Sequence, residues 1–176
     1  FDEDAPSSST YLGYNRNAPC PSATVQPLTS DRNTLTRQIG RMRASGQTAG
    51  HIGTAWGWYL VSPLWQGIWP SDSRPASYNP DKVTKAVLLM TDGEFNTEYV
   101  AANGSSSAQA RALCRNMKNE DVIVYTVGFM ANGTAERLLK DCASSPLHYF
   151  PASDGEALKR AFSLIAQSLS DLHLSQ

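Results

Sequence analysis

Long apolar runs, a surplus of basic residues and the common catalytic motifs are all missing from this sequence of 176 residues. No stretch approaches the roughly 20 apolar residues that a membrane-spanning helix needs. A formal net charge of −1 at pH 7 argues against broad binding to nucleic acid or anionic membranes. A Gly-x-Ser-x-Gly elbow, a His-Glu-x-x-His pair and a phosphate-binding loop are also absent, which argues against the enzymes that use them.

Cysteine is scarce and odd in number, with Cys20, Cys114 and Cys142. No Cys-x-x-Cys pair is present, and the spacing fits neither a zinc site nor a redox motif. We interpret the three residues as one disulfide and one leftover cysteine, whose partner would lie upstream of Phe1.

Two continuous apolar runs indicate the central strands. Ala86 to Met90 (AVLLM) and Val122 to Val127 (VIVYTV) are typical of strands that are buried on both faces of a parallel sheet. Weaker strands are expected at Ala23–Leu28, despite the unfavourable Pro27, and at Leu147–Phe150. Helical periodicity separates these segments. The alternation predicts a Rossmann-like α/β fold, a mainly parallel sheet with helices on both faces.

Apolar residues at intervals of three and four predict the helices. We expect the first helix to begin near Asp31 with Ser30 as N-cap, and the last to open on a capping box of Ser153 and Glu156. The expected apolar stripes contain Leu35, Ile39 and Met42; Ile52, Ala55, Trp56, Tyr59 and Leu60; Ala110, Leu113, Cys114 and Met117; Leu138, Leu139 and Cys142; and Leu158, Phe162, Ile165, Leu169 and Leu172.

Composition suggests how the chain is divided. Residues 1–22 are polar and rich in Ser, Asn and Pro, so we expect an extended loop or insert there. Residues 23–176 are expected to form one partial α/β domain, interrupted by a Pro-rich excursion at 62–81. Two firm strands are few for such a fold, so we expect its opening βα units to lie upstream of Phe1.

Asp92 and Thr48 are the candidates for chemistry. Asp92 follows the first apolar run directly, at the carboxyl edge of the sheet, where open α/β folds bind ligands. Its carboxylate suits a hard cation such as Mg²⁺, and the alternative is that it caps the following turn. Thr48 lies in a Gly-flanked loop before a helix, so its hydroxyl either caps that helix or reaches a ligand.

Four tryptophans are close together in the sequence: Trp56, Trp58, Trp65 and Trp69. Trp56 lies on an apolar stripe and is expected in the core. Trp58 is about 200° further round the helix. It either forms an exposed aromatic patch with Trp65 and Trp69, as at protein interfaces, or all of them pack the excursion onto the domain.

The segments AVLLMTDGE (Ala86–Glu94) and VIVYTVGF (Val122–Phe129) resemble the second half of a von Willebrand factor A domain. In that family a metal-ion-dependent adhesion site is built from an Asp-x-Ser-x-Ser loop, a Thr loop and an Asp loop. The resemblance maps the Thr role onto Thr48, in SGQTAGHIGTAWGW, and the Asp role onto Asp92. The Asp-x-Ser-x-Ser loop is absent, since Asp4–Ser9 follows no apolar strand. The resemblance therefore implies Mg²⁺ or a similar divalent cation, bound weakly or not at all by this chain alone.

Further blocks in the same order resemble the C-terminal domain of TadG-like proteins of the tight-adherence (Flp) pilus system. They are CPSATVQPLTSDRNTL, TAWGWYLVSPLW, LLMTDGEFNT, LCRNMK and LLKDCASSPLHYFPA. This resemblance implies a non-enzymatic adhesion or assembly module that binds a pilus or envelope protein. It also implies an extracytoplasmic place in the bacterial cell envelope, with a membrane anchor upstream of this chain.

An oxidising location favours a disulfide between Cys114 and Cys142, because both lie on apolar stripes of neighbouring expected helices. Two buried free thiols are the alternative. Two rivals to a binding module stay open. One is a metal-dependent hydrolase that uses Asp92 and Glu94, although no base pairs with them by spacing. The other is a structural envelope domain with a vestigial metal site.

Overall fold

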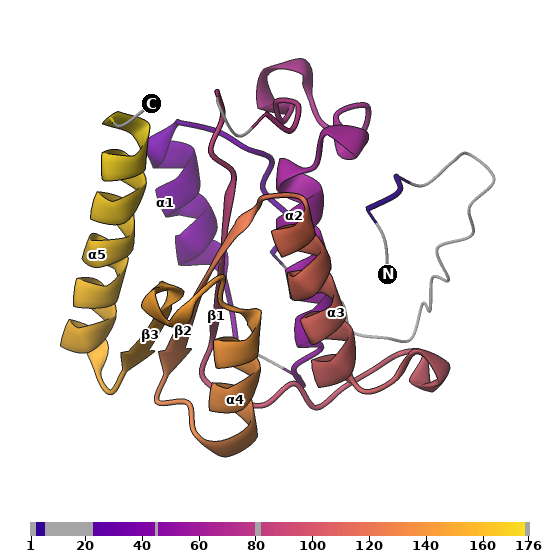
Figure 1. Cartoon of the computed structure of the whole chain (residues 1–176), viewed down its shortest axis with the longest axis vertical. Helices are drawn as coiled ribbons and strands as arrows, with labels where there is room; N and C mark the ends of the chain where they lie inside the picture. The colour runs from indigo at the N-terminus through magenta and orange to yellow at the C-terminus, as the bar shows by residue number, and fades with distance from the viewer. Residues whose placement is uncertain (1–2, 6–22, 45, 80–81, 175–176) are drawn as a thin grey trace.

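The computed structural model describes residues 3–5, 23–44, 46–79 and 82–174. Its centre is a three-stranded parallel sheet in the order β1-β2-β3. The strands are β1 (Ala86–Thr91), β2 (Ile123–Phe129) and β3 (Tyr149–Ala152). Because both strand pairs are parallel, each connection crosses over through a helix, as Figure 1 shows.

Helices cover both faces of the sheet (Figure 1). The helices α2 (Gly50–Val61), α3 (Ser106–Asn119) and α4 (Gly133–Cys142) pack on one face, and α5 (Gly155–Leu174) packs on the other. The predicted fold class, a Rossmann-like parallel sheet with helices on both faces, is therefore confirmed.

The alternation of side chains along β2 explains the two cores. Val124 faces the three-helix side, and its neighbour Tyr125 faces α5. The first core contains Ala55, Trp58, Val87, Phe95, Ala110, Leu113, Cys114, Met117, Val122, Val124, Leu138 and Cys142. The second contains Tyr125, Val127, Ala152 and Ile165. Both strands that the apolar runs predicted are confirmed, each with its end shifted by one or two residues.

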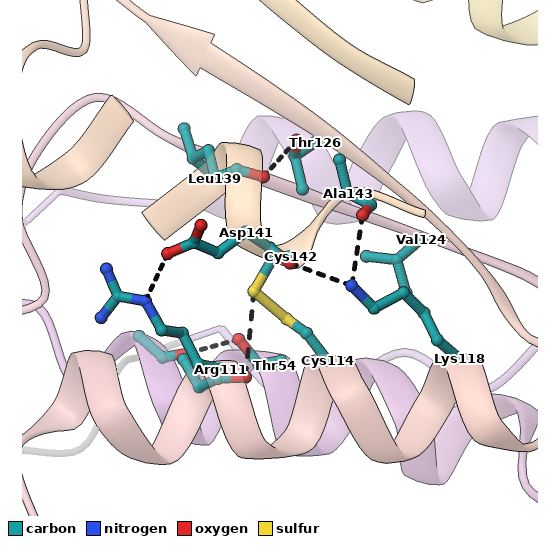
Figure 2. Close-up of a disulfide and its surroundings, with 12 residues drawn as sticks. Thr54, Arg111, Cys114, Lys118, Val124, Thr126, Leu139, Asp141, Cys142 and Ala143 are labelled. Carbon is teal, nitrogen blue, oxygen red and sulfur yellow. Dashed lines mark hydrogen bonds and ion pairs between the residues drawn. A yellow bond between two sulfur atoms is a disulfide. The ribbon is translucent and has the colours of Figure 1, made fainter. Parts of the chain in front are cut away.

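The predicted disulfide between Cys114 and Cys142 is present and joins α3 to α4 (Figure 2). Both cysteines are completely buried. Charged side chains lie near the disulfide at the protein surface. Arg111 Nε contacts Asp141 Oδ2 at 2.7 Å, and Lys118 Nζ donates to the main-chain carbonyl of Asp141 at 2.9 Å. The lysine thereby satisfies a carbonyl at the end of α4.

Two expectations about helix caps are wrong by one residue. Helix α1 (Arg32–Arg41) has Asp31 as N-cap, whose carboxylate accepts from the main-chain N–H groups of Asn33 and Thr34. At the start of α5, Asp154 Oδ1 accepts from the N–H of Ala157 at 2.8 Å. At the start of both helices, the N-cap is therefore the aspartate and not the serine that precedes it.

Two expectations about strands also need correction. Ala23–Leu28 is not a strand, in keeping with the missing N–H of its proline. The last strand begins at Tyr149, because Pro146–His148 forms the 3₁₀ turn η4 instead. Leu147 lies in that turn and is 84% exposed.

The apolar stripe of α1 is exposed. Leu35, Ile39 and Met42 are 40%, 66% and 56% exposed, and α1 has no buried residue. Among the described residues, no helix combines the length and apolar character needed to span a membrane.

The tryptophans pack inward. Trp58, Trp65 and Trp69 are only 2%, 6% and 9% exposed, and Trp56 is half-buried. The expectation that Trp56 lies in the core is therefore wrong, because the core contains Trp58 instead. Trp65 stacks on Tyr59 at 4.0 Å between ring centroids. The exposed aromatic patch is therefore wrong, and the alternative is confirmed: the rings pack the Pro-rich excursion, which includes the 3₁₀ turns η1 (Pro63–Trp65) and η2 (Ser71–Ser73), onto α2. The expectations for Cys20 and most of residues 1–22 lie outside the described residues.

Candidate functional site

Asp92 lies at the carboxyl edge of the sheet, directly after β1. Its side chain is exposed. The turn that it enters is closed by Thr91, whose hydroxyl accepts from the N–H of Gly93 at 3.2 Å and donates to the Gly93 carbonyl at 3.0 Å. The turn-capping role considered for Asp92 therefore belongs to Thr91, which leaves the carboxylate facing solvent.

Thr48 lies two residues before α2 and does not cap it. The N-cap is Ala49, which makes no side-chain hydrogen bond to the helix. The capping interpretation of Thr48 is therefore wrong. Its backbone makes long-range contacts instead.

The Thr48 loop is joined to the loop that follows Asp92. The N–H of Thr48 donates to Asn96 Oδ1 at 2.9 Å, and the N–H groups of Asn96 and Thr97 both donate to the Thr48 carbonyl, at 3.0 and 3.3 Å. The Thr97 hydroxyl also donates to Gln47 Oε1 at 2.6 Å. We call these contacts between residues 47–50 and 95–97 the loop clasp. It joins the Thr48 segment to Asn96, which lies four residues after Asp92.

Phe95 supplies the apolar part of the loop clasp. It is 7% exposed and belongs to the same core cluster as Trp58 of α2. A Cβ built on Gly50 would overlap the Phe95 ring. Only glycine at position 50 therefore lets the ring pack against the first turn of α2.

His51 fixes α2 to the start of α3. Its Nδ1 lies 2.8 Å from Ser106 Oγ, and the histidine is only 5% exposed. Burial lowers the pKa of the imidazole, and the Glu98 carboxylate opposes this shift in part. His51 is therefore a neutral link between two helices near the candidate site.

The described donors do not make up a complete metal centre. Within the described ranges, no three His, Cys, Asp or Glu residues are grouped so that they could hold a metal ion. Mg²⁺ requires near-octahedral oxygen coordination, whereas Asp92 and Thr48 offer one carboxylate and one hydroxyl. The assignment of these two residues as metal ligands stays a prediction.

Sequence reasoning missed Asn96 and Phe95, which hold the two loops together, and Ser106, which binds His51. Phe95 and Asn96 follow the TDGE segment directly. The available signal for a packed loop was an apolar residue beside a polar one at these two positions. No local signal identifies Thr48 as the partner, because a hydrogen bond across 48 positions depends on how β1 and α2 pack.

Comparison with known protein families identifies the family of this chain. No curated protein matches the chain in a direct comparison. The model of the von Willebrand factor type A domain family matches residues 12–164, which is most of the chain. The match includes the sheet, the Thr48 loop and Asp92. The chain belongs to the von Willebrand factor type A domain family.

Proposed function

We propose that this chain is a non-enzymatic protein-binding module of the bacterial cell envelope that takes part in the assembly of tight-adherence (Flp) pili. Domains of its family serve in general as protein-interaction and adhesion modules. The pilus association rests on the TadG-like sequence blocks, among them LLMTDGE and LLKDCASSPLHYFPA.

The loop clasp is the observation that carries this proposal. It joins the Thr48 loop to the loop that follows the exposed Asp92, at the edge of the sheet where α/β folds bind ligands. His51 is engaged by Ser106 of α3, so the nearest histidine in sequence to Thr48 serves as a structural contact. A binding face needs this kind of fixed, solvent-facing arrangement, which lowers the entropic cost of association.

In its finer form, the proposal is that the partner binds at a metal-ion-dependent adhesion-type site that includes Thr48 and Asp92. Because these donors are too few for Mg²⁺, we expect the chain alone to bind the ion weakly or not at all. The oxidised Cys114–Cys142 pair supports an extracytoplasmic location, since disulfides form and persist there. A membrane anchor outside this chain would hold the module at the envelope.

The test uses purified pilus and envelope proteins as partners. We expect Asp92→Ala to weaken partner binding at least about tenfold, and Glu94→Ala, its exposed neighbour, to leave affinity nearly unchanged. Equal affinities for wild type and Asp92→Ala would contradict the assignment of this edge as the binding face.

A second measurement addresses the metal. Thermal unfolding with Mg²⁺, Mn²⁺ or EDTA should give nearly the same midpoint for the chain alone, because weak ligands stabilise little at ordinary concentrations. Partner binding that EDTA abolishes would support the adhesion-type site. Partner binding that is insensitive to both EDTA and Asp92→Ala would favour a structural envelope domain with a vestigial site.

A further inference from the structure

A chain of hydrogen bonds connects the core to the acidic segment at residues 3–5. Trp58 Nε1 donates to the Tyr78 hydroxyl oxygen at 3.0 Å, and that hydroxyl donates to Glu3 Oε2 at 2.6 Å. Nearby, Trp65 Nε1 donates to the main-chain carbonyl of Glu3 at 2.7 Å. The carboxylate and the main-chain carbonyl of Glu3 are therefore both bound by residues more than 60 positions away.

The direction of these bonds is determined by chemistry. An indole nitrogen can only donate, so the Tyr78 oxygen must accept from Trp58 and its own proton is free for another acceptor. Burial raises the pKa of the Tyr78 phenol, which keeps that proton in place. The site therefore presents two fixed donors, a phenol and the Trp65 indole, and selects a partner with two acceptors.

Charged groups lie close to the Glu3 carboxylate. The Lys85 ammonium lies 4.6 Å from the centroid of the Tyr78 ring and is held by the carbonyls of Val61 and Ala76. Burial raises the pKa of the Glu3 carboxyl group, and Glu120 acts in the same direction, whereas the Tyr78 hydrogen bond and the Lys85 charge lower it. The phenol gives the carboxylate a charge-assisted hydrogen bond, which is stronger than the bond that it would give to a neutral amide oxygen.

This arrangement is far from the loop clasp. Lys85 directly precedes β1 and Asp92 directly follows it. The two positions are seven residue steps of about 3.3 Å apart along the strand, a distance of about 23 Å. The two surfaces lie at opposite edges of the sheet and can be tested separately.

We propose that Tyr78 and Trp65 form a binding site for a short acidic segment, in which a glutamate gives its carboxylate to the phenol and its main-chain carbonyl to the indole. Its occupant in this protein is the chain's own segment at residues 3–5. The site is independent of the proposed adhesion face, and an acidic peptide in solution competes for it.

The first test measures cleavage of the full chain after Glu3 by a glutamate-specific protease, followed by mass spectrometry. Cleavage after Glu98, which lies in an exposed loop, serves as the internal reference. Tyr78→Phe keeps the ring over Lys85 but loses the donor, so we expect cleavage after Glu3 to accelerate severalfold relative to Glu98. Tyr149→Phe removes a phenol from β3 and should change nothing at Glu3. Asp92→Ala should also leave the ratio unchanged.

The second test adds a fluorescent peptide of residues 1–7 to the full chain carrying Glu3→Gln, and follows anisotropy. We expect the peptide to bind, and a matched peptide with Glu3→Gln to bind at least about tenfold more weakly. Equal binding of both peptides would overturn the proposal. So would an unchanged cleavage ratio in a Tyr78→Phe variant whose unfolding curve matches that of the wild type.

Discussion

The main-chain N–H of Thr48 donates to Asn96 Oδ1 at 2.9 Å, and the N–H of Asn96 donates to the Thr48 carbonyl at 3.0 Å. This reciprocal pair joins two loops at the carboxyl edge of the sheet. Asn96→Ala removes the first bond and keeps the second. We expect the free energy of unfolding to fall by about 1 kcal/mol and the Thr48 amide to exchange faster. Amide hydrogen exchange measures the local effect. Asn103→Ala, in the 3₁₀ turn η3 (Ala101–Asn103), is the control and should leave Thr48 exchange as it is.

Two glycines of α2 form a matched pair. A Cβ at Gly50 would overlap the Phe95 ring, whereas a Cβ at Gly53 meets no atom within 4 Å. Gly50→Ala should therefore destabilise the chain by about 1–3 kcal/mol through overpacking. Gly53→Ala should stabilise it by up to about 1 kcal/mol, because alanine is the better helix former. Urea unfolding of both variants checks the signs. Equal destabilisation by the two would mean that Phe95 does not pack on Gly50.

The Cys114–Cys142 disulfide closes a loop with a sequence separation of 28 residues. On the chain-entropy model, its loss should lower the free energy of unfolding by about 3–4 kcal/mol. The measurement compares urea unfolding of Cys20→Ala with that of a variant in which Cys114 and Cys142 are also alanine. Keeping Cys20→Ala in both removes the third thiol from the comparison. Two free thiols in the denatured, non-reduced Cys20→Ala protein would contradict the pairing.

Protonation of His51 should make stability depend on pH. Burial lowers its pKa below the ordinary value of 6.5, so the unfolded chain takes up the proton more readily than the folded one. The free energy of unfolding contributed by this group is complete above about pH 6.5 and declines as pH falls through the lower folded pKa. Urea unfolding between about pH 7.5 and about pH 5.5 tests this.

The histidine control uses His51→Gln, which should show a smaller decline over the same range. His148, whose pKa burial also lowers, remains in both proteins and its effect cancels in the comparison. An identical decline in wild type and His51→Gln would show that His51 does not titrate differently on folding.

The strands, the helical stripes and the positions of the loops could be predicted from the local sequence. The runs at Ala86–Met90 and Val122–Val127 predicted strands, because continuous apolar runs are typical of strands buried on both faces of a parallel sheet. That burial is found for β2, whereas β1 is only partly buried and its Met90 is 49% exposed. The stripes with Cys114 and Cys142 face the same core, as helical periodicity predicted, and the expected oxidising location then favoured a disulfide over two free thiols. The positions of Asp92 and Thr48 in loops followed from the elements that flank them.

Short-range ambiguity caused the cap errors. Ser30 and Asp31 are adjacent residues that both cap helices well, and so are Ser153 and Asp154. A helix that begins one residue later fits the same apolar periodicity nearly as well, so the pattern does not distinguish the two caps. The structure selects the carboxylate in each case.

Only the tertiary structure decided which face of α2 is buried and what the loops contact. A helical wheel orders Trp56 and Trp58 around an axis, but it does not say which side meets the sheet, and Trp58 is the one in the core. The contacts of Thr48 with Asn96 and of Glu3 with Tyr78 connect residues 48 and 75 positions apart. Such contacts depend on how strands and helices pack, because the sequence separation alone contains no information about direction in space.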